Sequence, residues 1–104
     1  MSDIILSQGQ YLGAKQKTFE NEQFTFSITH HESLQTTDTH YHENSYLCIL
    51  INGSYFEKNN NSQNPVSAGD ILLRPSGYVH QNSFNKTGGR CFNIEFKQKW
   101  ERGT

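Results

Sequence analysis

The chain has 104 residues, of which 18% are charged and 33% apolar, and its formal net charge is −1. A chain of this length forms one domain, residues 1–104, near the lower end of the usual size range. The near-neutral charge argues against nucleic acid or an anionic membrane as a partner. No stretch approaches the roughly 18 apolar residues of a membrane-spanning helix. The first ten residues lack the pattern of a signal peptide, so we expect a cytoplasmic protein.

Strand patterns dominate the first half of the chain, where helical periodicity is hard to find. Residues 24–28 alternate Phe, Phe and Ile with polar residues, which is the period of a half-buried strand. Residues 46–51 form a short apolar run that suits a strand covered on both faces. The pair Asn52-Gly53 is the strongest short hairpin signal, and it predicts a turn before a further strand at 54–58.

The second half of the chain continues this pattern. Apolar or alternating segments at 71–73, 79–84 and 92–96 are separated by turn-forming residues at 68–70, 75–77 and 87–89. The last of these turns, Thr87-Gly88-Gly89, predicts another hairpin. About nine or ten short strands at this spacing predict an all-β sandwich or barrel with little helix.

The sequence His40-Tyr41-His42 is the first candidate site. In an extended segment, side chains two residues apart lie on one face, about 6.5 Å apart along the strand. Two imidazoles placed in this way can reach toward a common metal ion. Taken alone, such a pair also arises by chance among five histidines, and an exposed strand would tolerate it.

A third histidine, His80, follows the turn at 75–77 and completes a longer pattern. The two segments read H-x-H-x3-Y-x6-G from His40 to Gly53 and, after a 15-residue spacer, G-x5-P-x-G-x2-H-x3-F from Gly69 to Phe84. This resembles the paired motifs of the cupin superfamily, in which two His and a Glu of the first motif meet a His of the second. The resemblance implies a double-stranded β-helix, or jelly-roll barrel, with the three histidines inside it.

The chain departs from the cupin pattern at Tyr46, which stands where metal-binding cupins carry glutamate. A tyrosine could ligate only after losing a proton from a pKa near 10. The resemblance therefore implies a metal set of His40, His42 and His80 with water in the open positions. Zn²⁺, Fe²⁺, Ni²⁺ and Cu²⁺ all suit three imidazoles. The alternative is a barrel whose histidines bond one another, water or an organic ligand without a metal.

A narrower resemblance covers nearly the whole chain. Five segments look like the N-terminal effector-sensing domain of AraC-type transcriptional regulators: 10–13, 40–48, 53–57, 74–80 and 88–96. In that family a cupin barrel binds a small-molecule effector and a following pair of helix-turn-helix motifs binds DNA. No such motif is recognisable here. The resemblance thus implies a sensor barrel without its DNA-binding half.

Strand parity predicts the wall of the barrel cavity. Tyr46, Cys48 and Leu50 share the parity of His40 and His42, whereas Asn82 and Phe84 share that of His80. We expect these five residues to contact a small-molecule ligand. Cys48 and Cys91 are expected to be small apolar side chains inside the sheet rather than a disulfide or metal ligands.

Other polar residues are interpreted as structural. Glu43 follows His42 directly and should turn to the opposite face. Glu57 is interpreted as a surface or cross-strand charge, and Arg74 as an exposed arginine, with binding of an anionic ligand as the alternative. The adjacent His30 and His31 point apart, so a solvated or capping role is favoured for both.

The run at 46–51 also bears on oligomeric state. If His40 and His42 set the inward parity, Leu47, Ile49 and Ile51 point outward and form a patch that a monomer seldom exposes. Two coverings are open, namely the N-terminal segment 4–12 of the same chain or a second subunit. We expect a homodimer.

Three functions remain open from the sequence. The first is a sensor-like or regulatory cupin that binds a small molecule, with or without a divalent metal. The second is a metal-dependent, three-histidine enzyme such as a dioxygenase or isomerase. The third is a domain with a role in assembly that carries a relict site. The AraC-type resemblance favours the first.

Overall fold

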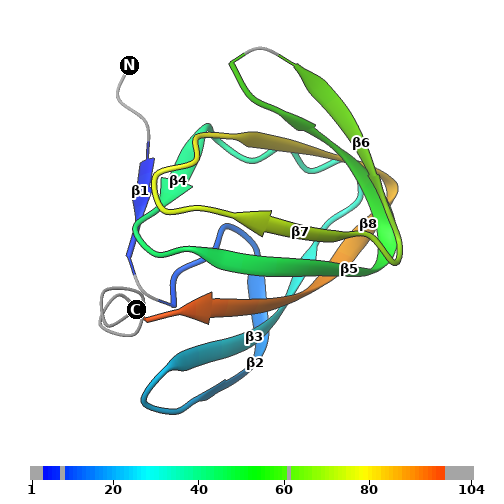
Figure 1. The fold of residues 1–104 in the computed structure, drawn as a ribbon. Helices are drawn as coiled ribbons and strands as arrows, with labels where there is room; N and C mark the ends of the chain where they lie inside the picture. Colours follow the sequence, from blue (N-terminus) through cyan, green and yellow to red (C-terminus); the bar gives the residue numbers. More distant parts are fainter. Residues whose placement is uncertain (1–3, 8, 61, 98–104) are drawn as a thin grey trace.

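The computed structural model describes residues 4–7, 9–60 and 62–97. Every regular element in this part of the chain is a strand (Figure 1), which confirms the predicted all-β class. Among these residues there is also no helix that could cross a membrane. The strands are β1 (Ile4–Leu6), β2 (Ala14–Glu20), β3 (Phe24–His31), β4 (His40–His42), β5 (Tyr46–Lys58), β6 (Gln63–Ser67), β7 (Ile71–Arg74) and β8 (Gln81–Phe96).

Two long strands, β5 and β8, run side by side and hold the barrel together (Figure 1). The first part of β5 and the last part of β8 lie in a sheet of order β2-β3-β8-β5-β7, which we call the large sheet. Their other halves pair with each other again, and there β5 also pairs with β6. Both strands therefore pass from one side of the barrel to the other.

The predicted hairpins at Asn52-Gly53 and at 87–89 are wrong, because β5 and β8 continue through these residues. Gly53 lies opposite Gly89, and register shifts between the two strands flank the position. Its φ is +86°, and a Cβ atom there would collide with the carbonyl oxygen of Gly88. Close backbone contact and a left-handed residue thus bend a continuous strand pair, where the sequence pattern suggested a reversal.

The large sheet turns its polar side chains inward. On β3, Thr25, Ser27 and Thr29 are buried, while Phe24 and Phe26 on the alternate face are only half-buried. Polar side chains also point inward along β8, where Asn93 and Glu95 are buried and the aromatic and aliphatic residues that alternate with them are only half-buried. Across the described residues, buried polar side chains outnumber buried hydrophobic ones.

A smaller hydrophobic cluster completes the interior. Tyr55 packs on Phe84 with ring centroids 4.7 Å apart, and Leu50, Val66 and Cys91 belong to the same buried group. Cys48 and Cys91 are both buried and unpaired, as the sequence predicted.

The bend at Gly53 gives a test of this architecture. Gly53→Ala should lower the free energy of unfolding by about 3 kcal/mol or more, because the left-handed backbone costs about 1–2 kcal/mol and the collision adds to it. Gly69→Ala is the matched control, since Gly69 has φ +95° but open space around its Cβ position. Gly69→Ala should lower the free energy of unfolding only by the cost of the left-handed backbone. Equal losses in urea denaturation of the two variants would contradict the packed bend.

Candidate metal centre

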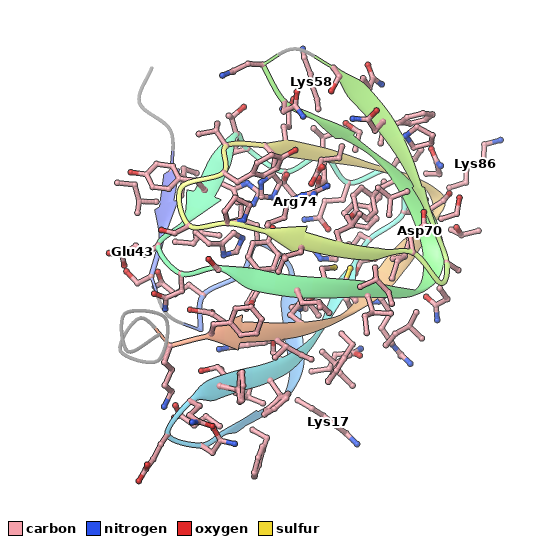
Figure 2. The ribbon with its side chains drawn as sticks, viewed as in Figure 1. Lys17, Glu43, Lys58, Asp70, Arg74 and Lys86 are labelled. Atoms are coloured by element: carbon pink, nitrogen blue, oxygen red, sulfur yellow. The ribbon has the colours of Figure 1, made fainter. Side chains whose placement is uncertain are left out.

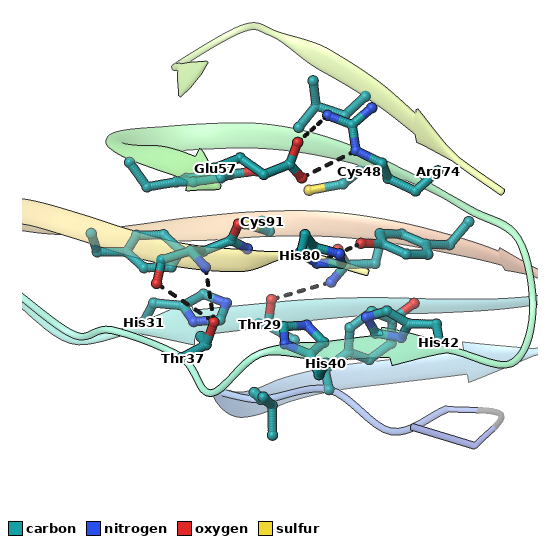
Figure 3. Close-up of a pocket in the computed structure, with 18 residues that line it drawn as sticks. Thr29, His31, Thr37, His40, His42, Cys48, Glu57, Arg74, His80 and Cys91 are labelled. Carbon is teal, nitrogen blue, oxygen red and sulfur yellow. Dashed lines mark hydrogen bonds and ion pairs between the residues drawn. The ribbon is translucent and has the colours of Figure 1, made fainter. Parts of the chain in front are cut away.

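The three histidines come from two segments that pair through their backbones. His40 and His80 form an isolated bridge in which each backbone N–H donates to the carbonyl oxygen of the other residue, both at 2.9 Å. This pairing places the two rings beside each other, with centroids 4.3 Å apart. His42 lies on the same face of β4, and one nitrogen from each of the three rings lies within 4.8 Å of the others. The predicted convergence of the rings is confirmed (Figure 3).

Backbone carbonyl groups orient two of the rings. Nδ1 of His40 lies 2.7 Å from the carbonyl oxygen of Asp38, and Nδ1 of His80 lies 3.2 Å from that of Tyr78. A carbonyl accepts only, so each Nδ1 carries the proton and each Nε2 keeps its lone pair. Metal-binding histidines are held in this way in proteins.

Burial keeps the histidines neutral. It lowers the pKa of all three, to about 3 for His42 and to about 4 for His80, and the neighbouring imidazoles lower the pKa values further. A neutral imidazole is the form that binds a metal. The centre is therefore ready to bind a cation at neutral pH without first releasing protons from its rings.

Tyr46 occupies the position next to these rings. Its ring lies 4.4 Å from that of His42, centroid to centroid, and its hydroxyl group lies 3.2 Å from Nε2 of His80. Burial raises the pKa of Tyr46, so the phenol stays protonated and donates to that nitrogen. The tyrosine thus caps His80 instead of supplying a fourth, charged ligand.

The N-terminal segment closes one side of the centre through Glu95, a residue that the sequence analysis passed over. Its buried carboxylate accepts hydrogen bonds from the backbone of Gly9 at 2.9 Å, from Asn44 at 2.8 Å and from the hydroxyl of Tyr11 at 3.4 Å. Burial raises the pKa of Glu95. These bonds hold the Tyr11 ring 5.0 Å from that of His42.

Glu57 and Arg74 form a second polar group, drawn above the histidines in Figure 3. The surface interpretation of Glu57 is wrong, because its side chain is only 2% exposed. The exposed interpretation of Arg74 is also wrong, since its guanidinium donates two hydrogen bonds to Glu57, one of 3.1 Å from Nε. Tyr78 donates a further bond of 3.2 Å to the same carboxylate. Both side chains lie on inward positions, Glu57 on β5 and Arg74 on β7. The sequence did not show that they pair, because the two residues are far apart along the chain.

The solvated interpretation of His31 is wrong as well. His31 is buried and stacks on Phe84 with centroids 4.3 Å apart, because it is the last inward residue of β3. Only His30 turns outward. Glu43 is exposed, as predicted from its parity.

The three histidines, Tyr46 and the Glu57–Arg74 pair line one cavity. Its empty space, counted together with the open mouth, is about 460 Å³. Of the residues predicted to contact a ligand, Tyr46, Cys48, Asn82 and Phe84 line it. Leu50 has the predicted inward parity, but it packs into the hydrophobic cluster next to the Gly53 bend. The wall also contains Thr29, Thr37 and Asn93, which the sequence did not single out, and His31, Glu57 and Arg74, for which it favoured other positions.

The three histidines fit a divalent transition metal. They supply neutral nitrogen donors with two carbonyl-oriented rings, and Nδ1 of His42 is buried without a hydrogen-bond partner. A buried ring nitrogen of this kind costs free energy unless it gains a partner. The donor set does not distinguish Zn²⁺ from Fe²⁺, Ni²⁺ or Cu²⁺.

Comparison with solved structures identifies the architecture. A cupin domain from Bordetella pertussis Tohama I matches with a TM-score of 0.64 and 19% identity over 86% of this chain and 99% of that one. The cupin domain of Schizosaccharomyces pombe Cnp3 matches with a TM-score of 0.71 and 12% identity, over 86% and 63% of the two chains. The fold is a cupin barrel.

A third similar structure is the polyketide cyclase RemF from Streptomyces resistomycificus, with a TM-score of 0.65 and 16% identity over 73% of this chain and 56% of that one. No protein-family model matches the chain, and no curated protein is similar to it in sequence. At these identities the likeness concerns the fold, and the jelly-roll prediction is confirmed at that level.

The lowered pKa values predict how the metal-free protein responds to acid. The folded state keeps His42 and His80 neutral down to about pH 3 and 4, whereas the unfolded chain takes up protons near pH 6.5. The free energy of unfolding should therefore have its full value above pH 6.5 and should decrease as the pH falls toward 4. Each histidine contributes a slope of up to about 1.4 kcal/mol per pH unit.

Chemical denaturation of chelator-treated protein between pH 4 and 8 measures this slope. The His42→Gln variant should show a shallower slope than the unmodified protein. A stability that stays constant from pH 7 to pH 4.5 would contradict neutral, buried histidines.

Proposed function

We propose that this protein is a sensor-like binding barrel, which takes up a small molecule next to a divalent metal held by His40, His42 and His80. The convergence of the three imidazoles inside a cavity is the observation that carries the proposal. A divalent ion held there would supply a Lewis-acid position for an oxygen or nitrogen atom of the ligand. The buried, unpaired cysteines accord with the cytoplasmic location expected from the sequence.

The cavity wall favours a neutral ligand rich in hydrogen-bonding groups. Thr29, Thr37 and Asn82 line it with hydroxyl and amide groups. Its one carboxylate, Glu57, is neutralised by Arg74, so neither charge is free to select an ion of opposite sign. An anion at Arg74 would have to displace a bidentate carboxylate, which disfavours that alternative.

Binding is favoured over catalysis by the state of the acid–base groups. Glu57 is held by Arg74 and Tyr78, and Tyr46 is a phenol whose pKa is raised by burial. No carboxylate that lines the cavity is available to exchange a proton with a substrate near pH 7. The AraC-type resemblance of the sequence supports a regulatory role for such a binding barrel.

A metal-dependent enzyme is the second candidate. Three histidines leave coordination positions open for a substrate, and the structurally similar RemF is named as a polyketide cyclase. Turnover by this route would depend on the metal for its Lewis-acid chemistry, because Glu57 and Tyr46 are not free to act as acid–base groups. A dioxygenase or an isomerase would fit that requirement.

Metal content tests the proposal directly. Purified protein loaded with Zn²⁺ or Ni²⁺ and passed through a desalting column should retain about one ion per chain, measured by mass spectrometry of the metal. His80→Ala should retain less than about a tenth of that amount, because two imidazoles do not hold these ions tightly. Glu43→Ala is the control and should retain it fully, since Glu43 is exposed. Full retention by His80→Ala would refute the three-histidine site.

The hydroxyl group of Tyr46 gives a second, finer test. It donates to Nε2 of His80, the nitrogen that its carbonyl-bound ring leaves free, so the bond must break before that atom binds a metal. Tyr46→Phe removes only this bond and should tighten metal binding about fivefold, which corresponds to about 1 kcal/mol. Competition with a chromogenic chelator measures the change. Weaker binding in Tyr46→Phe would show instead that the tyrosine is itself a ligand.

A further inference from the structure

The outward face of the large sheet is apolar across all five of its strands. Register pairing aligns Phe19, Phe26, Ile94, Leu47 and Leu73 in one row that crosses the sheet from β2 to β7. A second row contains Ile28, Phe92, Ile49 and Ile71. We call the nine residues of these two rows the outer face.

This face is exposed to a degree that a monomer seldom shows. Phe19 is 65% exposed, Ile71 63% and Leu73 60%, while the six others are half-buried. At about 200 Å² for a fully exposed large side chain, the outer face presents roughly 650 Å² of apolar surface. The largest apolar patch of a typical monomer is about 300–600 Å². An ordinary subunit interface buries about 800 Å² on each partner.

The described part of the same chain does not cover this face. The N-terminal strand β1 was the alternative covering, but it pairs in parallel with β4, with Ile4 opposite His40 and Leu6 opposite His42. The segment that follows binds Glu95 on the inner side of the sheet. The outward positions of Leu47, Ile49 and Ile51 agree with their predicted parity.

We propose that the outer face is the interface of a homodimer in which two large sheets pack face to face. The face complements itself. At its β2 edge lies a shallow groove whose lining includes Phe19, Phe26, Ile28 and Phe92 together with Lys17, Thr18 and Ser27, and at its β7 edge Ile71 and Leu73 are exposed. A two-fold axis parallel to the central strand β8 lays the β7 edge of each subunit over the β2 edge of its partner.

Charge is consistent with this packing. Along the two rows the one charged residue is Lys17, which pairs with Ile28 on the edge strand β2 and points outward (Figure 2). A position on the rim lets its ammonium group stay in water while its stem covers apolar surface. Two copies with a net charge of −1 each repel one another weakly.

Sedimentation and light scattering between about 1 and 200 μM test the proposal. The unmodified protein should have twice its chain mass of 12.0 kDa. Leu73→Glu should raise the dimer dissociation constant on the order of a hundredfold or more, because each interface would bury two carboxylates in an apolar face. Because Leu73 is exposed in the monomer, its replacement should not affect folding, and circular dichroism checks this.

Phe56→Glu is the matched control. Phe56 is an exposed aromatic residue on the half of β5 that pairs with β6, away from the large sheet, and this variant should remain dimeric. A monomeric mass of the unmodified protein at every concentration would overturn the proposal. So would a dimer that survives Leu73→Glu or separates with Phe56→Glu.

Discussion

The reversed polarity of the large sheet is the constraint on which the rest of this structure depends. Its strands place Thr, Ser, Asn, Glu and His side chains inside the barrel, where each polar group costs free energy unless it finds a partner. The interior is accordingly tied together by hydrogen bonds, as where Asn93 donates to both Thr29 and Ser27 at 3.1 and 3.4 Å. The same alternation sends the Phe, Ile and Leu side chains outward. A polar cavity and an apolar exterior are thus two results of one pattern.

The chemistry of the cavity follows from this interior. Burial lowers the pKa values of His42 and His80 and raises the pKa of Tyr46, so these imidazoles and this phenol are uncharged at neutral pH. The ion pair in the cavity wall, between Glu57 and Arg74, is internally neutral. The imidazoles of His40, His42 and His80 are therefore the neutral nitrogen donors at the centre, and a cation there would replace the hydrogen bond from Tyr46 to His80. Since β3, β5 and β8 each bear cavity residues on one face and outer-face residues on the other, a ligand and a second subunit would contact opposite sides of the same strands.

The sequence predicted the fold and the histidine centre because both depend on local pattern and spacing. His40 and His42 lie two apart on one strand, and the turn at 75–77 brings His80 to them. Prediction failed where an outcome depended on contacts distant in sequence. Gly53 follows an asparagine as in a hairpin turn, and only its contact with the backbone of Gly88 and Gly89 shows that it bends a continuous strand. Glu57 and Arg74 look like surface charges until β5 and β7 are paired, and His31 looked solvated because nothing local showed which face of β3 is inside.

X-ray absorption at the edge of a bound Zn²⁺ or Ni²⁺ identifies the ligand atoms of the metal centre themselves. We expect three imidazole nitrogens, together with oxygen from water, at about 2.0–2.1 Å for zinc. Cys48 and Cys91 are the sulfur donors in the cavity wall. Scattering from sulfur at about 2.3 Å, or a first shell without imidazole, would contradict a centre built from His40, His42 and His80.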